Sequence, residues 1–503
     1  MEISSIFICT LFVAQIHFSQ GLKILGIFPY PSKSHFTFNN AVMKSLIDAR
    51  HEVTVITCFP DQASQQNYTS IIDISKEELM FKGKPFATVF AKSTFALLTR
   101  VMNAERPFCY EIMKLPEIQL ALTSNKKLYD VIFVEILLLY NCFLPLAAKF
   151  NVPVIGTEAF KQEYYADYSI GNPQHPGYIF FEAVSNRWDK DSFLGRFSNV
   201  WIYLEAILFN YLYLVPCLET FHQDHLDQLA PLSKYKDIAP SLIFYNNHPA
   251  SLSRPSVPNA IEVGCIHAQR AEPLPKDIEK FIDEAVHGVI LFSVGSLVKA
   301  ATMPSKTIHT FREAFAEIPQ RVIWKYENRM ENVPNNVMLL DWLPQRSILE
   351  HKNVKVFISH CGQGGMYEAI YSATPVVSCA ITTDQFINAN ILRKMEAAVQ
   401  LDITNISKED ILTALNRIIN DTKYRTNMEK LSKILKDRPM SPEQSVVYWT
   451  EYIARHNGAP HLKTASLQLN WIQYLLLDVI FFTFSIFIII GSLIYCTFKR
   501  ILR

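Results

Sequence analysis

The chain carries two series of short apolar runs, each followed by a polar turn and an amphipathic stretch. In the first series, the run 22–29 (LKILGIFP) leads through the polar loop YPSKSH into a helical pattern and then into the run 52–57 (EVTVIT). Two further runs, 129–135 (YDVIFVE) and 151–156 (NVPVIG), are separated by enough residues for a helix. Near-continuous apolar runs that alternate with helices are typical of parallel sheets covered on both faces. The first half therefore predicts a doubly wound parallel sheet.

A second series with the same rhythm follows a change in composition. Residues 246–284 are polar and rich in proline, as in NNHPASLSRPSVPNA and AEPLPKD, which favours an interdomain linker. The apolar runs then resume as GVILFSVGS, RVIWKYE, NVMLLDWLPQ, NVKVFISH and TPVVSCA. We therefore expect an α/β protein with one domain at 22–245, a linker at 246–284 and a second doubly wound domain at 285–465. A separate apolar stretch, 201–214, is too short to span a bilayer, and we interpret it as a buried helix in preference to a membrane-facing one.

Both ends of the chain have the pattern of targeting segments. Residues 1–21 have an apolar core followed by small residues, which indicates a secretory signal peptide, with a short buried strand as the alternative. Near the other end, a run without charged residues has the length of about 20 residues that a bilayer helix needs. A basic tail follows this run. We expect a transmembrane helix at 475–498 and a cytoplasmic tail at 499–503. These features predict a single-pass type I membrane protein with most of its mass in the lumen of the endoplasmic reticulum.

Composition and charge exclude several classes of protein. A chain of 503 residues with 49% hydrophobic residues is long enough for more than one core and too apolar to be disordered. The net charge of +1 does not indicate the positively charged surface that binds nucleic acid. The nine cysteines are scattered without metal-ligand spacing, so neither a metal site nor a full disulfide framework is expected. Asn-x-Ser/Thr sequons at Asn67, Asn405 and Asn420 are compatible with a glycoprotein.

A glycine cluster follows one of the apolar runs in the second half. In FISHCGQGGMYEAI, Gly362, Gly364 and Gly365 lie between a strand and a helix that we expect to begin at Met366. Glycines at this point let a ligand approach the backbone, and a helix N-terminus offers free N–H groups to an anion such as phosphate. The pattern is neither a Walker A loop nor a dinucleotide fingerprint. His360 could donate to the same anion; a tight turn with a capping histidine is the alternative.

Other polar and aromatic residues also stand at the carboxyl ends of the strands in this half, where open parallel sheets bind ligands. Glu368 would lie on the first turn of the helix and could accept hydrogen bonds from sugar hydroxyls. Trp342 offers a flat ring for a base, and an amide follows it in the same loop. This amide is the side chain of Gln345. The remaining candidates are Ser296, Asp384 and Gln385. Together these groups favour a nucleotide with a sugar attached.

With these motifs, the chain resembles the UDP-glycosyltransferase family, of the membrane-anchored animal type that includes UDP-glucuronosyl- and UDP-glucosyltransferases. The resemblance covers nearly the whole length and is carried by FSVGS, DWLPQ, FISHCGQGGMYEAIYSATPVVSCAITTDQFINA, GNPQHPGY and RPMSPEQSVVYWTEYIARHNGA. It implies the GT-B fold, in which two Rossmann-like domains face a cleft. It also implies that the first domain binds a small lipophilic acceptor, that the second binds the UDP-sugar, and that transfer inverts the sugar.

The resemblance also implies roles for individual residues. Trp342 would stack on uracil, and Gln345 would bond the nucleoside. The diphosphate would be held by His360, Ser296 and the amide of Gly365, beside Gly362. Glu368 would take the ribose hydroxyls. The transferred sugar would be held by Asp384 and Gln385.

The catalytic base implied by the resemblance is His35, in YPSKSHF. An acceptor hydroxyl is a poor nucleophile, and a positioned histidine contributes about 10²–10⁴-fold as general base. A carboxylate normally orients such a histidine and stabilises the imidazolium. The family's aspartate is replaced here by Glu135, which is one methylene longer and could weaken the pair. Asp130 would lie at the wrong end of the sheet. Further departures, which we interpret as packing changes, are Ala373, Glu396 and Ala398.

The expected reaction is transfer of a hexose from a UDP-sugar to a hydroxyl of a small lipophilic acceptor. The alternatives are a non-catalytic UDP-sugar-binding homologue or partner subunit, and an anchored carrier of lipophilic ligands. We favour UDP-glucose over UDP-glucuronic acid as donor, because the signature segment has no distinctive cation for a carboxylate. No metal or other cofactor is expected: we interpret the Asp-x-Asp of residues 189–191 as a solvated loop. Homo- or hetero-oligomerisation is left open.

Overall fold

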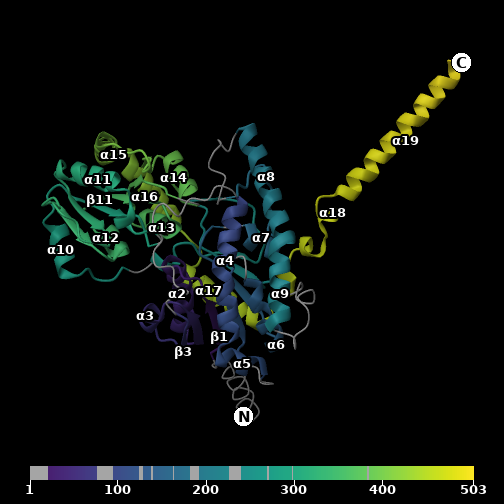
Figure 1. Cartoon of the computed structure of the whole chain (residues 1–503), viewed down its shortest axis with the longest axis horizontal. Helices are drawn as coiled ribbons and strands as arrows, with labels where there is room; N and C mark the ends of the chain where they lie inside the picture. Colours follow the sequence, from purple (N-terminus) through teal and green to yellow (C-terminus); the bar gives the residue numbers. More distant parts are fainter. Residues whose placement is uncertain are drawn as a thin grey trace, which may run out of the picture.

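The computed structural model describes residues 21–75, 94–123, 128–136, 140–161, 164–181, 192–225, 239–268, 271–296, 298–381 and 384–502. These residues form two parallel sheets, one in each half of the chain, and helices cover the faces of both sheets. Figure 1 shows the two halves side by side, the N-terminal one mostly in purple, blue and dark teal and the C-terminal one in lighter teal to green. The prediction of two doubly wound α/β halves is therefore confirmed.

The N-terminal sheet has seven parallel strands in the order β3-β2-β1-β4-β5-β6-β7. The strands are β1 (Lys23–Phe28), β2 (Glu52–Thr57), β3 (Ser70–Asp73), β4 (Val131–Glu135), β5 (Val154–Glu158), β6 (Leu242–Tyr245) and β7 (Ala260–Glu262). β7 lies inside 246–284, the range expected to be a linker, and it pairs with β6. The N-terminal sheet therefore extends further along the chain than the proline-rich composition suggested.

Both faces of this sheet are buried, which explains the near-continuous apolar runs of its strands. Ile24 of β1 points to a core shared with helix α2, whereas Leu25 points to a second core on the opposite face. The helices of this half are α2 (Lys33–Asp48), α3 (Pro60–Ser64), α4 (Thr94–Met113), α5 (Pro116–Thr123), η2 (Tyr140–Phe143), α6 (Leu144–Phe150), α7 (Tyr164–Ile170), α8 (Phe193–Phe209), η3 (Asn210–Leu214) and α9 (Val215–His225).

The C-terminal sheet has six parallel strands in the order β10-β9-β8-β11-β12-β13. The strands are β8 (Val289–Ser293), β9 (Arg321–Lys325), β10 (Val337–Leu340), β11 (Val354–Ser359), β12 (Val376–Ser378) and β13 (Ala398–Gln400). The helices that follow β7 are η5 (Ile266–Ala268), α10 (Lys276–Asp283), η6 (Ala300–Thr302), α11 (Ser305–Ala316), α12 (Gln345–Glu350), α13 (Gln363–Tyr371), α14 (Asp384–Lys394), α15 (Lys408–Asn420), α16 (Lys423–Lys436), α17 (Pro442–Arg455), η7 (Pro460–Leu462), η8 (Ala465–Gln468), α18 (Trp471–Tyr474) and α19 (Leu477–Ile501).

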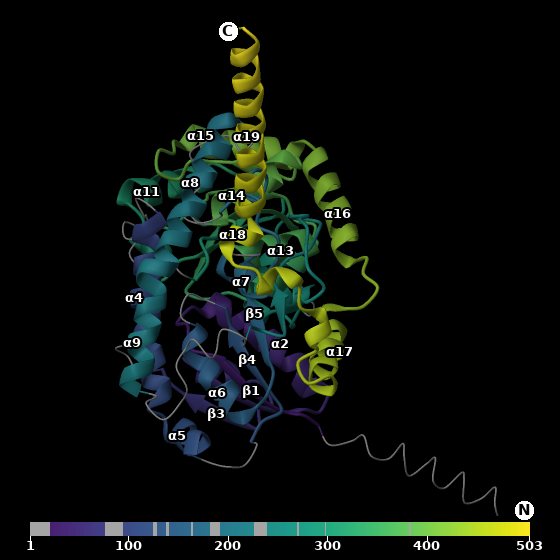
Figure 2. The ribbon, with the colours of Figure 1, turned by 90° about the vertical axis from the view of Figure 1, so that its right-hand side faces the viewer.

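Helix α17 belongs to the C-terminal part of the sequence but packs on the N-terminal half. Its buried residues Val446 and Ile453 lie in the same core as Val42 and Met43 of α2. Figures 1 and 2 show α17 beside α2, away from the C-terminal sheet. The chain therefore passes between the two halves twice, once after η5 and once between α16 and α17.

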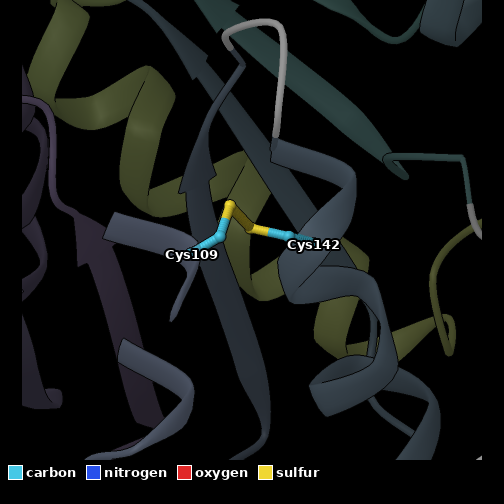
Figure 3. Close-up of a disulfide and its surroundings, with 2 residues drawn as sticks. All are labelled: Cys109 and Cys142. Carbon is cyan, nitrogen blue, oxygen red and sulfur yellow. A yellow bond between two sulfur atoms is a disulfide. The ribbon is translucent and has the colours of Figure 1, made fainter. Parts of the chain in front are cut away.

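One disulfide joins α4 to η2. Cys109 and Cys142 are bonded across a Cα–Cα distance of 6.1 Å (Figure 3). The other cysteines of the described residues form no disulfide. The spacing of the cysteines along the chain did not indicate this pair.

Two segments are long and apolar enough to cross a membrane. One is α19, which projects away from the rest of the molecule and is exposed along its length (Figure 1). The other runs through α8, η3 and part of α9. It buries one face, including Tyr203 and Phe209, and exposes another that includes Trp201 and Leu212. The preference for a buried helix at 201–214 is thus correct for one face only.

Candidate active site

His35 and Glu135 meet at the carboxyl edge of the N-terminal sheet. β1 and β4 are neighbours, so the residues that follow β1 lie beside the last residue of β4, which is Glu135. His35 is the third residue of α2. Its Nδ1 lies 2.5 Å from Oε1 of Glu135, and the two side chains are 7% and 2% exposed. The extra methylene of Glu135 therefore does not prevent contact with the histidine.

Aromatic rings hold the imidazole of His35 on two sides. The Phe160 ring and the imidazole pack edge to face, with 4.6 Å between their centroids. The centroid of the Tyr30 ring lies 4.8 Å from that of the imidazole. Because Glu135 accepts at Nδ1, this nitrogen carries the hydrogen and Nε2 keeps its lone pair. This is the tautomer that a general base requires.

The glycine cluster begins a helix one turn earlier than expected. α13 starts at Gln363, with Gly362 as its N-cap, so Gly364 and Gly365 lie in the first turn. Glu368 consequently lies on the second turn and not on the first, which corrects the sequence-based prediction. Glycine suits this first turn because its N–H groups have no partner within the helix, and no side chain obstructs their approach to an anion.

His360 is enclosed by two glycines. A Cβ added at Gly362 would lie 2.5 Å from Nε2 of His360, and one at Gly295 would be equally close to the ring. Gly295 also has a φ of +83°, so two features favour glycine there. Burial, and then the nearby charge of Lys325, lower the pKa of His360 to about 4. Its Nδ1 has no hydrogen-bond partner among the described residues. A hydrogen bond between the ring and the backbone of Ser293 acts on the pKa of His360 in the opposite direction.

The two residues expected to hold a nucleoside contact each other. Nε2 of Gln345, the first residue of α12, donates to Oε2 of Glu368. Burial raises the pKa of Glu368 to about 7, and the contacts with Gln345 and Arg346 act in the opposite direction. This carboxylate is therefore poised to change its protonation near neutral pH.

Trp342 follows β10 and contacts the N-terminal half. Its side chain is 55% exposed, as a ring that stacks on a ligand would be. Nζ of Lys33 lies 3.5 Å from the centroid of this ring, and Nζ of Lys325 lies 5.7 Å from it. Lys33 stands two residues before His35. The carboxyl edges of the two sheets therefore face each other at this contact.

The candidate residues follow the order of the strands. Across neighbouring strands β10, β9, β8 and β11, the carboxyl ends carry Trp342, Lys325, Ser296 and His360 in turn. Lys33 and Lys325 were missed by the sequence analysis. The only signal for Lys325 was its place as the polar last residue of an apolar strand, and Lys33 becomes notable only when the two halves are brought together.

Asp384 and Gln385 begin α14 and are buried. Nδ2 of Asn388 donates to Asp384 and to the carbonyl of Cys361, at 2.9 Å each. The backbone N–H of Ile381 donates to Gln385. These bonds connect the start of α14 to the residue that follows His360.

The Asp-x-Asp of residues 189–191 lies outside the described residues. Among the residues that the structure describes, no three His, Cys, Asp or Glu side chains gather in a way that could hold a metal ion.

Comparison with known proteins adds to this geometry. The family model for UDP-glucoronosyl and UDP-glucosyl transferase matches residues 27–503. The chain is 36% identical over 491 residues to UDP-glucosyltransferase 2 of Dactylopius coccus, a match that covers 94% of this chain and 92% of that protein. It is 30% identical over 493 residues to human UDP-glucuronosyltransferase 2B7, with 93% and 92% covered.

The fold is also that of solved glycosyltransferases. The calicheamicin glycosyltransferase CalG4 matches with a TM-score of 0.54 and 15% identity, over 86% of this chain and 99% of that one. Glycosyltransferase VinC, solved in complex with DTDP, matches with a TM-score of 0.58 at the same identity and coverage. These likenesses and the two parallel sheets confirm the GT-B fold. The family match, the close relatives and the fold agree, and the chain belongs to the UDP-glycosyltransferase family as a glycosyltransferase enzyme.

Proposed function

We propose that this enzyme transfers a hexose from a UDP-sugar to a hydroxyl group of a small lipophilic acceptor, with inversion at the sugar. The observation that carries the proposal is the His35–Glu135 pair, which lies at the edge of the N-terminal sheet that faces Trp342. A base from one half and a ring for the nucleoside from the other are the two elements that such a transfer requires.

The chemistry follows from the geometry of the pair. Nε2 of His35 takes the proton of the acceptor hydroxyl as its oxygen attacks the anomeric carbon. The bond between that carbon and the diphosphate oxygen breaks on the opposite face, so the sugar is inverted and UDP leaves with the electron pair. Glu135 stabilises the imidazolium that forms, because its carboxylate is already in contact with Nδ1. The proton is released from His35 after the product leaves.

The donor would lie along the carboxyl ends of the C-terminal sheet. Uracil would stack on Trp342, and the ribose would reach Glu368 and Gln345. The diphosphate would meet the first turn of α13, with Gly362 and Gly365. Three further groups complete the proposed donor site: His360 and Ser296 at the diphosphate, and the start of α14 at the hexose, through Asp384 and Gln385.

We favour UDP-glucose as the donor, because relatives such as UDP-glucosyltransferase 2 of Dactylopius coccus are named for it. The UDP-sugar is a co-substrate, and the proposed mechanism needs no metal. The acceptor would lie against the rings of Phe160 and Tyr30, which border His35 and suit a lipophilic molecule. We assign the acceptor to the half at 22–245, extended by β7, and the donor to 285–465.

Membrane attachment is supported by α19, whose apolar side chains are exposed along the helix. We propose that it spans the endoplasmic reticulum membrane once, with both sheets in the lumen and the basic residues after Thr497 in the cytoplasm. Helix α8, which carries exposed apolar side chains, lies on the side of the N-terminal half from which α18 and α19 leave, as Figure 1 shows for the helices. That position suits contact with the same bilayer. The expected signal peptide, 1–21, lies outside the described residues except for Gly21.

The alternative of a non-catalytic homologue rested on Glu135. The contact between Glu135 and His35 argues against this alternative.

The test of the proposed function uses microsomes from cells that express the full chain, incubated with a panel of phenols and either UDP-glucose or UDP-glucuronic acid. Transfer from UDP-glucose that disappears in His35→Ala microsomes supports the proposal. Absence of transfer to every phenol from both donors, in protein that still binds UDP, would contradict it.

A further inference from the structure

We propose that Lys33 binds an oxyanion of the UDP-sugar, so that the half carrying the catalytic base also contributes a cation to the donor site. This inference rests on the proposed function. It assigns to Lys33 the direct recognition of charge on the nucleotide sugar.

The position of Lys33 is set by the helix that also carries His35. Lys33 is the first residue of α2, and its side chain crosses to the other half, where Nζ lies 3.5 Å from the centroid of the Trp342 ring. The ammonium lies over one face of this ring, and the Trp342 side chain is still 55% exposed, so the ring is not enclosed. Lys33 therefore reaches the place where the nucleoside of the donor is expected to bind.

The charges around Trp342 do not balance. Lys325 is buried and donates to Glu327, which neutralises it. Lys33 has no carboxylate partner among the described residues. Both ammonium groups lie near the same ring, 3.5 and 5.7 Å from its centroid, and burial, and then the charge of Lys325, lower the pKa of Lys33. A partly buried cation without a carboxylate partner is unfavourable unless a ligand supplies the anion.

The donor supplies such an anion at the right place. Lys325 ends β9, between the strand that leads to Trp342 and the strand that leads to Ser296. A nucleotide that stacks on Trp342 and reaches the first turn of α13 must pass this point. The oxyanion is either the diphosphate, present in every UDP-sugar, or the carboxylate of a uronic acid sugar.

The experiment measures ligand affinity of the full-length protein in detergent micelles by calorimetry. The ligands are UDP, UDP-glucose and UDP-glucuronic acid, with uridine as a competitor that lacks any anion. Lys33→Met and Lys33→Gln remove the charge, and Lys33→Arg keeps it. Lys44→Met is the matched control, because Lys44 lies on the same helix in an exposed ion pair with Asp48.

We expect both neutral variants to weaken UDP and UDP-glucose about 10- to 100-fold, as loss of a hydrogen bond to a charged group does. Uridine affinity should stay nearly unchanged, and Lys33→Arg and Lys44→Met should bind like the wild type. A loss confined to UDP-glucuronic acid would identify the carboxylate as the oxyanion. Unchanged affinity for all three anionic ligands, or an equal loss for uridine, would overturn the inference. If the wild type bound none of the UDP ligands, the proposed function itself would fail.

Discussion

His35 and Glu135 form a buried pair in which Nδ1 of the imidazole lies 2.5 Å from Oε1 of the carboxylate. The two residues are 100 positions apart in the sequence. They meet because β1 and β4 are neighbours in a parallel sheet, where all carboxyl ends share one edge. The longer acid is therefore compatible with a base at position 35.

Replacement of His35 by alanine should abolish most of the turnover. We expect kcat to fall by about 10²–10⁴-fold, because the acceptor hydroxyl loses its general base. The affinity for UDP should stay close to that of the wild type, since the proposed donor site does not include the His35 side chain. Initial rates with a responsive phenol, together with calorimetric UDP binding, check both parts. A variant that keeps its turnover would exclude His35 as the base.

Changes at Glu135 should separate its charge from its length. Glu135→Gln keeps the size but cannot stabilise an imidazolium, and we expect a fall in kcat of about two to four orders of magnitude. Glu135→Asp keeps the charge but retracts the carboxylate from His35, so we expect a smaller loss. The ratio of kcat values for the two variants is the measurement. An aspartate variant less active than the glutamine variant would argue against an electrostatic role.

Trp342→Ala should weaken binding of UDP and uridine alike. Base–aromatic stacking contributes about 1–3 kcal/mol per base, so both affinities should fall by a similar factor. Trp201→Ala on α8 is a matched control, because its side chain is also 55% exposed. Calorimetry on the two variants decides the point. A loss for UDP without a loss for uridine would show that Trp342 does not stack on the base.

The affinity for UDP-glucose should depend on pH through Glu368. Burial raises the pKa of this carboxyl to about 7 in the free enzyme. If the ribose hydroxyls donate to the carboxylate, the bound state has a lower pKa, and binding is favoured above about pH 7 and weakened below it. We expect a loss of up to about tenfold between about pH 8 and about pH 6. Glu368→Gln should bind more weakly and remove this pH dependence; a variant with the same pH profile as the wild type would exclude Glu368 as its origin.

Ile453→Ala on α17 should destabilise the protein. Ile453 is fully buried in the core that α17 shares with α2. Truncation of a buried isoleucine costs about 2–5 kcal/mol of unfolding free energy, so the midpoint of thermal unfolding should fall by several degrees. Ser445→Ala on the same helix should change it little. Equal midpoints for Ile453→Ala and the wild type would show that α17 does not stabilise the N-terminal half.

The sequence predicted the strands well because a strand covered on both faces must be apolar throughout, as VIFVE of β4 is. It misplaced the start of α13 because glycines in a row favour a loop, whereas the first turn of a helix tolerates them. Cysteine spacing carries no information about which pair meets, so the Cys109–Cys142 bond could not be predicted. The contact between Lys33 and Trp342 joins residues of opposite halves, and no local pattern indicates it.

The second passage of the chain between the halves has a mechanical consequence. With covalent connections both after η5 and before α17, separation of the halves is restrained at two points, and an opening about the line that joins these points would move the connections least. Because α17 packs against α2 in one core, the helix that carries His35 would move together with the N-terminal sheet. Donor exchange and alignment of the base would then be one coupled movement.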